Sequence, residues 1–279
     1  MIQVSVVIPN YKKLPLIKYL PDVIKACPKA EIIVVDDASP DDTVQYLKVN
    51  FPQVKVVKNK SNQRFAVSCN NGVMVASGKI IVLLNTDVAP KLNFLAPLIK
   101  HFDDDNVFAV SCLEIQSHGV SGRNYCQFKR GFLIHSTAPV SAGENCWATG
   151  GSSAFDRKKY LQIGGMDSLY YPAYWEDIDL SWQAREKYGW KILFEPKSQV
   201  YHNHETTNVS VFGQRKMELM AMRNQILFVW KNIRGRRLLE HFLWLPYHFI
   251  FTTYRTQGLF LIAFLQALIK WVKYKLCKH

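Results

Sequence analysis

Short runs of β-branched and aliphatic residues alternate with helical patterns over the first ninety residues. Residues 13–26 and 62–77 carry apolar positions three and four residues apart, as amphipathic helices do, and Pro40 to Thr43 is typical of a turn that opens a helix. The alternation predicts βαβ units and an α/β fold with an open, mainly parallel sheet flanked by helices. The runs that predict buried strands are VSVVIPNY (4–11), AEIIVVDDAS (30–39), VKVVKN (54–59) and KIIVLLNTD (79–87).

Two of these predicted strands end in acidic residues. Asp36 and Asp37 close one strand, and Asp87 follows another after Asn85. Ligands of open α/β sheets bind beyond the carboxyl ends of the strands, where Asp87 is suited to hold a divalent cation against a diphosphate. Asp36 and Asp37 are equally suited to capping the next turn. No GxGxxG or P-loop pattern follows an early strand, so these residues do not predict a dinucleotide-binding loop.

The segment from 147 to 207 combines a glycine-rich turn, an acidic helix start and a strand that ends in histidines. Glu176, Asp177 and Asp179 open the helix, where the helix dipole alone would favour acids. His202 and His204 alternate with one residue between them, so in a strand they would share a face. They are therefore candidates for metal ligands, and equally for surface or hydrogen-bonded core histidines.

Composition limits the class of protein. The chain has 279 residues, of which 48% are hydrophobic, so it can bury a substantial core. Lysine and arginine outnumber the acids 35 to 22, which suits an anionic partner such as nucleic acid, a phosphorylated substrate or a membrane surface. The N-terminus is typical of a first strand rather than a signal peptide, so we expect a cytoplasmic protein. The cysteines show no CxxC pair, so we expect free thiols at 27, 69, 112, 126, 146 and 277.

The chain changes character after residue 233. Two apolar segments, separated by Pro246, Arg255 and Gly258, are each too short for a spanning helix. We predict a catalytic domain over 1–233 and a helical membrane-association tail over 234–279, the alternative being a hairpin packed on protein. Because the charge gathers in this tail and forms no aromatic-interleaved patch, we expect no nucleic-acid partner. The basic residues that would meet anionic headgroups are Arg234, Arg236, Arg237, Lys270, Lys273, Lys275 and Lys278.

An ordered set of motifs resembles one enzyme family. The chain is similar to family 2 glycosyltransferases with the GT-A fold, particularly the rhamnosyltransferase-like and galactofuranosyltransferase-like members, over about residues 3 to 232. The segments that carry this resemblance are VSVVIPNY, IIVVDDASPDDT, LLNTD, GGSSAF, GGMD, WEDIDLSWQAREKYGW and His202.

The resemblance implies a set of donor-binding residues. Asp37 resembles the acid that hydrogen-bonds the nucleotide base, with Pro9 and Tyr11 lining the same pocket. This acid suits uracil and thymine alike, so UDP- and dTDP-sugars both stay open. Arg64 stands where similar sequences carry glycine, and it would either touch the donor pyrophosphate or fill the loop differently.

The resemblance also implies the metal and the base. Asn85 to Asp87 occupies the place of the DxD motif, with Asp87 as a ligand of Mg²⁺ or Mn²⁺ and with asparagine where a first acid is usual. His202 resembles the family's late metal ligand, and Asp177 resembles the general base. Arg223-Asn224 resembles a pair common after that histidine and is a weaker hint.

On the acceptor side we predict Gly150, Gly151, Trp175 and Glu176. Aromatic faces stack on sugars, although Trp147 and Trp175 are equally suited to a core.

The implied reaction is inverting transfer of a single sugar to a hydroxyl of a glycan or lipid-linked glycan, in cell-surface polysaccharide synthesis at the inner face of the membrane. The segment GQRKMEL lacks the tryptophan of the processive QxxRW motif. A sugar-phosphate nucleotidyltransferase would need a glycine-rich, basic signature near the first strand, which PNYKKLPL does not supply. A retired transferase fold that only binds glycans or serves as a scaffold remains the alternative, but it predicts loss of Asp87 or Asp177.

Overall fold

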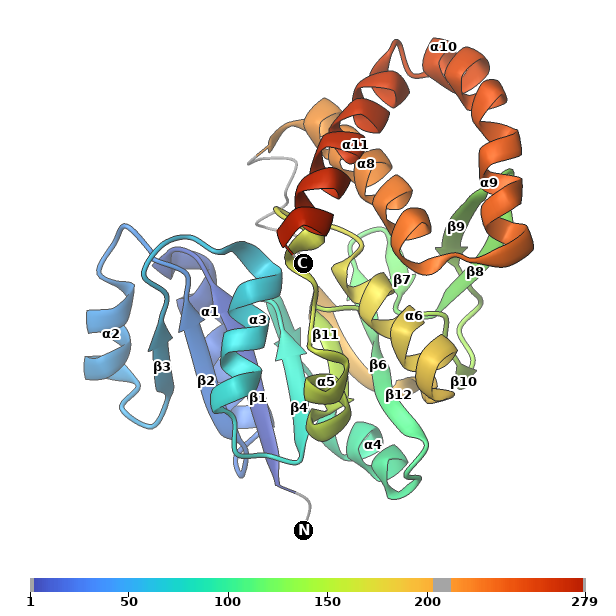
Figure 1. The fold of residues 1–279 in the computed structure, drawn as a ribbon. Helices are drawn as coiled ribbons and strands as arrows, with labels where there is room; N and C mark the ends of the chain where they lie inside the picture. Colours follow the sequence, from blue (N-terminus) through green and yellow to red (C-terminus); the bar gives the residue numbers. More distant parts are fainter. Residues whose placement is uncertain (1–2, 203–211, 278–279) are drawn as a thin grey trace.

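A computed structural model describes residues 3–202 and 212–277. One large sheet runs through the molecule, and helices cover both of its faces (Figure 1). Its N-terminal half is wholly parallel and has the order β3 (Lys55–Lys58), β2 (Glu31–Asp36), β1 (Val4–Asn10) and β4 (Ile80–Leu84). These are the four strands that the apolar runs predict.

The second half of the sheet is mixed. β11 (Ser152–Asp156) runs antiparallel between β4 and β6 (Val107–Gln116), and β12 (Lys191–His202) follows parallel to β6. Three short strands pair with β6 or β12, and a hairpin forms a separate two-stranded sheet. They are β5 (Val88–Pro90) and β10 (Gly143–Glu144) on β12, β7 (Gly119–Ser121) on β6, and the hairpin β8 (Asn124–Lys129) with β9 (Phe132–Thr137).

The helices fall into two groups. Those on the sheet are α1 (Lys13–Ala26), α2 (Thr43–Asn50), α3 (Arg64–Val75), α4 (Leu95–Ile99), η1 (Lys100–Asp103), α5 (Arg157–Ile163), η2 (Ser168–Tyr170) and α6 (Glu176–Tyr188). After the sheet come α8 (Gln214–Asn232), α9 (Gly235–Tyr247), the π-helical turn η3 (His248–Thr252), α10 (Thr253–Arg255) and α11 (Leu259–Cys277).

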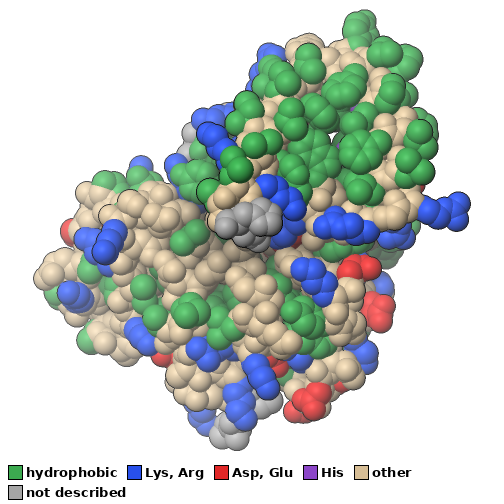
Figure 2. Space-filling view, in the orientation of Figure 1, with side chains coloured by type: hydrophobic (Ala, Val, Ile, Leu, Met, Phe, Trp, Pro, Cys, Tyr) green, Lys and Arg blue, Asp and Glu red, His purple; other side chains and the backbone are tan. Residues whose placement is uncertain are grey.

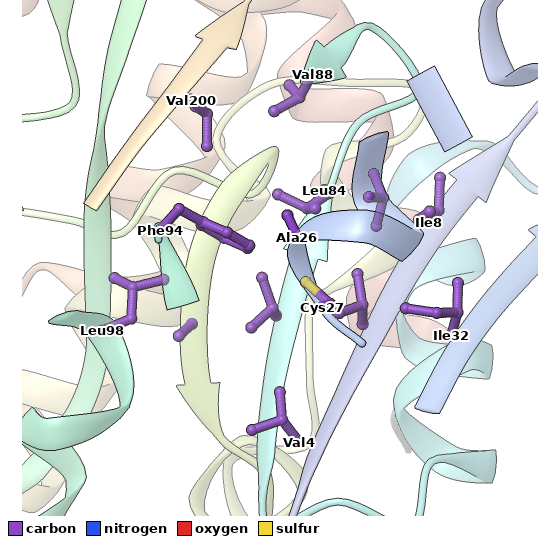
Figure 3. Packing of buried hydrophobic residues seen from close by; sticks show 14 of the residues in the cluster. Val4, Ile8, Ala26, Cys27, Ile32, Leu84, Val88, Phe94, Leu98 and Val200 are labelled. Carbon is purple, nitrogen blue, oxygen red and sulfur yellow. The ribbon is translucent and has the colours of Figure 1, made fainter. Parts of the chain in front are cut away.

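The strands bury both of their faces, because successive side chains point to opposite sides. On one side, Val6 and Ile8 of β1 join a cluster with α1, α2 and α4. Figure 3 shows part of this cluster, in which Phe94 lies between Leu98 and Leu84 in the view. On the other side, Val7 packs in a second cluster with α3, α5 and α6. This two-sided burial explains why the strand sequences are almost unbroken apolar runs.

A third cluster joins β9 and α6 to the C-terminal helices. It includes Phe132 of β9, Trp182 of α6, Phe228 of α8 and Ala263 of α11. Residues 235–277 rise from this cluster as a helical arch (Figure 1), which we call the tail arch. Within the described ranges, none of the helices combines the length and the apolarity needed to cross a bilayer.

The cysteine prediction is wrong for two of the six residues. Cys126 on β8 and Cys146 form a disulfide, with their Cα atoms 5.9 Å apart. A backbone hydrogen bond from Cys146 to Asn124 holds the two segments together. Twenty residues separate the cysteines, so only the tertiary fold shows that they meet. Cys27, Cys69, Cys112 and Cys277 are free, as expected.

Candidate active site

The predicted nucleotide-base residues meet at the carboxyl ends of β1 and β2. Pro9 pairs with Val35, and the Asp37 amide donates to the carbonyl of Asn10 at 2.8 Å. Tyr11 follows β1 with 45% of its surface exposed. The parallel register of the two strands therefore brings Pro9, Tyr11 and Asp37 together at one edge of the sheet.

Asp37 is held by groups far along the chain. Its carboxylate accepts hydrogen bonds from the amides of Gln63 and Arg64 at 2.7 and 2.8 Å, and from Asn59 Nδ2 at 2.9 Å. Asp37 thus binds the start of α3 instead of capping the turn that follows it. Asp36 takes that second role, since its Oδ2 accepts from the Ser39 amide at 3.3 Å.

Arg64 begins α3 in the left-handed backbone region, with φ of 67°. This conformation is uncommon for a residue with a Cβ atom, which is why glycine would suit the position. Its guanidinium carbon lies 5.5 Å from the centre of the Phe212 ring. Arg64 Nε is buried without a hydrogen-bond partner in the described structure, so it is able to donate to an anionic ligand.

Strand pairing brings the two predicted metal ligands together. Val88, the residue after Asp87, pairs with His202 in the β5–β12 ladder. Asp87 Oδ1 consequently lies 3.4 Å from His202 Nε2, and both side chains are almost buried. Among residues 3–202 and 212–277 there is no group of three or more potential ligands, and Asp87 and His202 form a pair of candidate donors. This pair fits a divalent cation whose other ligands are diphosphate oxygens and water. His204 lies outside the described residues.

A second carboxylate, which the sequence interpretation missed, completes this arrangement. Glu114 on β6 lies with Oε2 3.3 Å from His202 Nδ1, and the hydroxyl groups of Ser121 and Ser152 donate to the same carboxylate. Burial alone would raise the pKa of Glu114, but the hydrogen bonds from His202 and Ser152 hold it at about 2. Burial lowers the pKa of His202, yet Asp87 and Glu114 raise it to about 9. The sequence signal that could have identified Glu114 was an acidic residue inside the apolar run FAVSCLEI.

The predicted base opens α6 beside the glycine turn. Asp177 Oδ2 accepts from the Gly150 amide at 3.2 Å, and Oδ1 accepts from the amide of Ile178 at 2.8 Å. Burial raises the pKa of Asp177, although these two amides oppose the shift. Glu176 is 6% exposed, and its Oε2 has no hydrogen-bond partner in the described structure. Burial, followed by the charge of Asp177, raises the pKa of Glu176 as well.

The glycine turn also touches the strand end that carries the metal ligand. The Asn85 amide donates to the Gly151 carbonyl at 3.0 Å. A Cβ atom at Gly151 would lie 2.5 Å from Asn85 Nδ2, and one at Gly150 would lie 2.8 Å from the Phe65 ring. The close approach therefore requires both glycines, and it places Asp177 and the Asn85–Asp87 segment around one turn.

The backbone just before the base is strained. Tyr174 and Trp175 both have left-handed backbone angles, with φ of 72° and 81°. Asn224 of α8 holds this turn, because its Nδ2 lies 2.8, 2.8 and 2.9 Å from the carbonyl oxygens of Tyr170, Ala173 and Tyr174. The weak hint from Arg223-Asn224 thus corresponds to a structural support of the turn that carries Asp177. Strain of this kind gathers at functional sites.

The predicted acceptor tryptophan lies mostly in the core. Trp175 is 5% exposed, and its ring centre lies 5.1 Å from that of Phe228 and 5.7 Å from that of His135. Trp147 is 8% exposed and lies 4.9 Å from the same histidine ring. His135, which the sequence interpretation did not select, is the solvent-exposed member of this group. An acceptor-binding role for Trp175 stays a prediction.

The family model for glycosyl transferase family 2 matches residues 5–163, more than half of the chain. The chain belongs to glycosyl transferase family 2. The resemblance noted in the motifs is therefore confirmed.

Curated relatives of the family share about a quarter of their residues with this chain. Pre-mycofactocin glycosyltransferase of Mycobacterium tuberculosis is 26% identical over 185 residues, which cover 63% of this chain and 38% of that protein. N-acetylglucosaminyl-diphospho-decaprenol L-rhamnosyltransferase of the same species is 24% identical over 211 residues, which cover 62% of this chain and 66% of that protein. The chain thus matches less than two thirds of either relative.

Solved structures show the same fold. GalNAc-T7 with UDP, GalNAc and Mn²⁺ superposes with a TM-score of 0.67 at 20% identity, covering 82% of this chain and 48% of that one. A mannosyltransferase of Pyrobaculum calidifontis with GDP-Man and Mn²⁺ gives 0.60 at 17% identity, covering 96% and 86%. These similarities confirm the GT-A fold that the family resemblance implied.

Proposed function

We propose that this protein is an inverting, metal-dependent glycosyltransferase that moves a single sugar from a UDP- or dTDP-sugar to a hydroxyl of a glycan or lipid-linked glycan. The observation that carries the proposal is the glycine turn, where the Gly150 amide binds Asp177 and the Gly151 carbonyl binds Asn85. This turn connects the half-buried carboxylate of Asp177 with the end of the strand that leads to Asp87. A base and a leaving-group site are the two groups that direct displacement requires.

Asp177 is the base in this mechanism. Its Oδ2 accepts the proton of the acceptor hydroxyl as that oxygen attacks the anomeric carbon from the side opposite the departing nucleotide. The bond to the leaving diphosphate oxygen breaks as the new glycosidic bond forms, so no covalent sugar intermediate arises. The amides of Gly150 and Ile178 orient the carboxylate, and burial raises its pKa towards the range in which a carboxylate is an effective base.

Asp87 and His202 would hold a divalent cation, Mg²⁺ or Mn²⁺, which neutralises the charge that grows on the leaving diphosphate. Glu114 fixes the imidazole of His202 from its other ring nitrogen, as carboxylates behind metal-binding histidines commonly do. Two of the solved structures with this fold carry Mn²⁺ and a nucleotide or nucleotide sugar, which supports the assignment.

The edge formed by Pro9, Tyr11 and Asp37 would bind the nucleotide base, and Arg64 would bind the donor pyrophosphate. The hydrogen bonds from the α3 amides keep Asp37 in place beside β1. The buried and unpartnered Nε of Arg64 is the donor that an anionic group would satisfy.

The surface of the tail arch supports the part of the proposal that concerns the membrane, namely that the acceptor is lipid-linked and that the protein acts at the inner face of the membrane. Figure 2 shows hydrophobic side chains gathered over the arch, with basic side chains along its lower edge. Single exposed hydrophobic residues are common, but a contiguous patch rimmed by positive charge suits an anionic bilayer surface. The same helices bury Phe260 and Ala263 in the cluster that contains β9 and α6, so one side of the arch packs on protein and the other side is exposed. The large exposed residues of the patch are Leu239, Phe242, Leu243, Ile250, Phe251, Tyr254, Leu261, Ile262, Leu265, Leu268, Ile269, Val272 and Leu276.

The activity is tested by measuring nucleoside-diphosphate release from a panel of UDP-, dTDP- and GDP-sugars with membranes that contain the protein, in Mn²⁺ or in EDTA. We expect release from one uridine or thymidine donor, and its loss in EDTA and in Asp87→Ala. Asp105→Ala, which removes an exposed acid, is the matched control and should keep full activity. Nucleotide binding without turnover of any donor, with acceptor-bearing membranes present, would favour the retired transferase fold.

Membrane contact is tested by flotation with vesicles of phosphatidylcholine containing phosphatidylglycerol. Leu243→Glu places a charge at a residue of the arch that is 70% exposed, and it should abolish flotation. Val49→Glu makes the same change at a residue of α2 that is 66% exposed, and it should float as wild type does. Equal flotation of the two variants would contradict a membrane role for the arch.

A further inference from the structure

Two positively charged side chains from different helices converge on one backbone oxygen. Arg223 Nη2 of α8 and Lys270 Nζ of α11 donate to the Tyr171 carbonyl at 2.8 and 2.6 Å. Both cations are partly shielded from solvent. A neutral carbonyl has two lone pairs and can accept both bonds, but it offers no negative charge to offset the two cations.

Within residues 3–202 and 212–277, neither cation has a salt-bridge partner. Asp167 lies in the same region, but Lys231 at 2.7 Å and the Tyr274 hydroxyl at 2.6 Å already occupy its carboxylate. Burial and then the charge of Arg223 lower the pKa of Lys270 to about 7, and Asp167 opposes this shift only in part. Burial also lowers the pKa of Arg223. The positive charge at this point is therefore poorly compensated, which a bound anion would correct.

The location of the pair connects it with the acceptor. Tyr171 begins the strained turn that leads into Glu176 and Asp177, and Asn224, the neighbour of Arg223, holds that turn. Lys270 belongs to the helix whose other side chains, such as Ile269, form the exposed apolar patch of the tail arch. The pair thus connects the turn that leads to the base with the helix that carries part of the apolar patch. An acceptor that carries its sugar on a lipid phosphate has an anionic group between the sugar and the apolar chain.

We propose that Arg223 and Lys270 form a binding site for a phosphate group beside the acceptor side of the crevice. The phosphate of a lipid-linked acceptor and the diphosphate of the donor share the chemistry that the pair would recognise. This inference rests on the proposed transfer to such an acceptor. Arginine and lysine together provide several donors for the oxygens of a phosphate, and charge-assisted hydrogen bonds of this kind are strong.

The test measures binding of geranyl diphosphate and of geraniol to the full-length protein by calorimetry, in EDTA so that no metal contributes. We expect Lys270→Gln to weaken geranyl diphosphate binding about 10- to 100-fold, as the loss of a charge-assisted hydrogen bond does, and to leave geraniol binding unchanged. Lys270→Arg should keep most of the affinity. Lys158→Gln removes the same charge from an exposed position on α5, outside the tail arch, so it should bind as wild type does.

A second arm measures binding of UDP with Mn²⁺ to the same variants. Unchanged UDP affinity in Lys270→Gln would identify the lipid-linked acceptor as the source of the phosphate, and a matching loss would identify the donor. If Lys270→Gln binds both ligands as wild type does, or if Lys158→Gln weakens them equally, the phosphate site is overturned while the proposed function stands. A wild-type protein that binds no nucleoside diphosphate in Mn²⁺ would instead contradict the proposed function.

Discussion

The candidate site has two halves, a proposed nucleotide half and a proposed catalytic half, which are built in different ways. In the nucleotide half, the predicted residues follow consecutive strands, and Pro9, Asp37 and Asn85 stand at the carboxyl ends of β1, β2 and β4. In the catalytic half, Glu114 and His202 come from strands that are distant in the chain, and Asp177 opens a helix. Local pattern places the first group because parallel crossovers bring strand ends to one edge. The second group depends on strand pairings that no local pattern specifies.

The path of β12 illustrates the difference. Its pairing with β6 changes register between Glu195 and Gln199, beside Pro196, and its last residues then pair with β5. Such an irregularity re-aims the strand that follows it. Here it leads His202 to a position between Asp87 and Glu114. A one-residue change in this bulge would turn His202 away, so the metal pair depends on a tertiary feature more than the nucleotide edge does.

The largest effect should come from the base in the catalytic half. Asp177→Asn keeps the shape of the side chain but removes its ability to accept a proton, so kcat should fall about 10²- to 10⁴-fold. The affinity for UDP in Mn²⁺ should stay unchanged, because the nucleotide half is intact. The measurement is transfer rate together with calorimetric UDP binding, with Glu186→Gln as an exposed control on the same helix. A loss of nucleotide binding that matches the loss of rate would mean that the two halves are not separable.

The next effect concerns the carboxylate behind His202. Glu114→Gln should weaken Mn²⁺ binding in the presence of UDP about 10- to 100-fold, as changes behind metal-binding histidines typically do. Electron paramagnetic resonance titration of Mn²⁺ measures this affinity without relying on turnover. Glu144→Gln on the exposed strand β10 is the control. Unchanged metal affinity would restrict Glu114 to a packing role.

A smaller effect is expected from the support of the strained turn. Asn224→Ala removes the donor shared by the carbonyl groups of Tyr170, Ala173 and Tyr174, and leaving such groups unsatisfied costs about 1–3 kcal/mol of unfolding free energy. The melting temperature should fall and kcat should fall with it, because the turn carries Asp177. Asn93→Ala, at an exposed position, should change neither quantity. A melting temperature equal to that of wild type would show that the turn holds its own shape.

The smallest effect is on the pH profile. Because burial raises the pKa of Asp177 above its ordinary value of about 3.9, the deprotonated base is depleted earlier as the pH falls. We expect the acidic limb of kcat, followed between pH 7 and pH 5, to lie at higher pH than an exposed aspartate would give. An acidic limb at the ordinary value would contradict the raised pKa. Initial-rate measurements over this pH range distinguish a raised acidic limb from an ordinary one.

Much of this architecture could be predicted from the sequence. The strands at 4–11, 30–39, 54–59 and 79–87 were predicted because β-branched runs that bury both faces leave little ambiguity. Asp87 was selected from its position at a strand end, and the nucleotide-base role of Asp37 was predicted from the family resemblance. The disulfide and the role of Glu114 could not be predicted, since both depend on pairing partners in the folded sheet. The sequence also left undecided whether the tail packs on protein or contacts a membrane, because an apolar helix pattern does not specify which face of the helix packs on protein.

By itself, then, the sequence determined the βαβ order, the acids at the strand ends, the family motifs and the basic, apolar character of the C-terminal tail. These properties depend on neighbours within a few residues, where periodicity and turn chemistry act. Only the tertiary structure decided that His202 lies between Asp87 and Glu114, that Cys126 meets Cys146, and that Arg223 and Lys270 share one carbonyl. Those contacts join residues that are 20 or more positions apart, and only the packing of strands and helices into one sheet and one arch brings them within bonding distance.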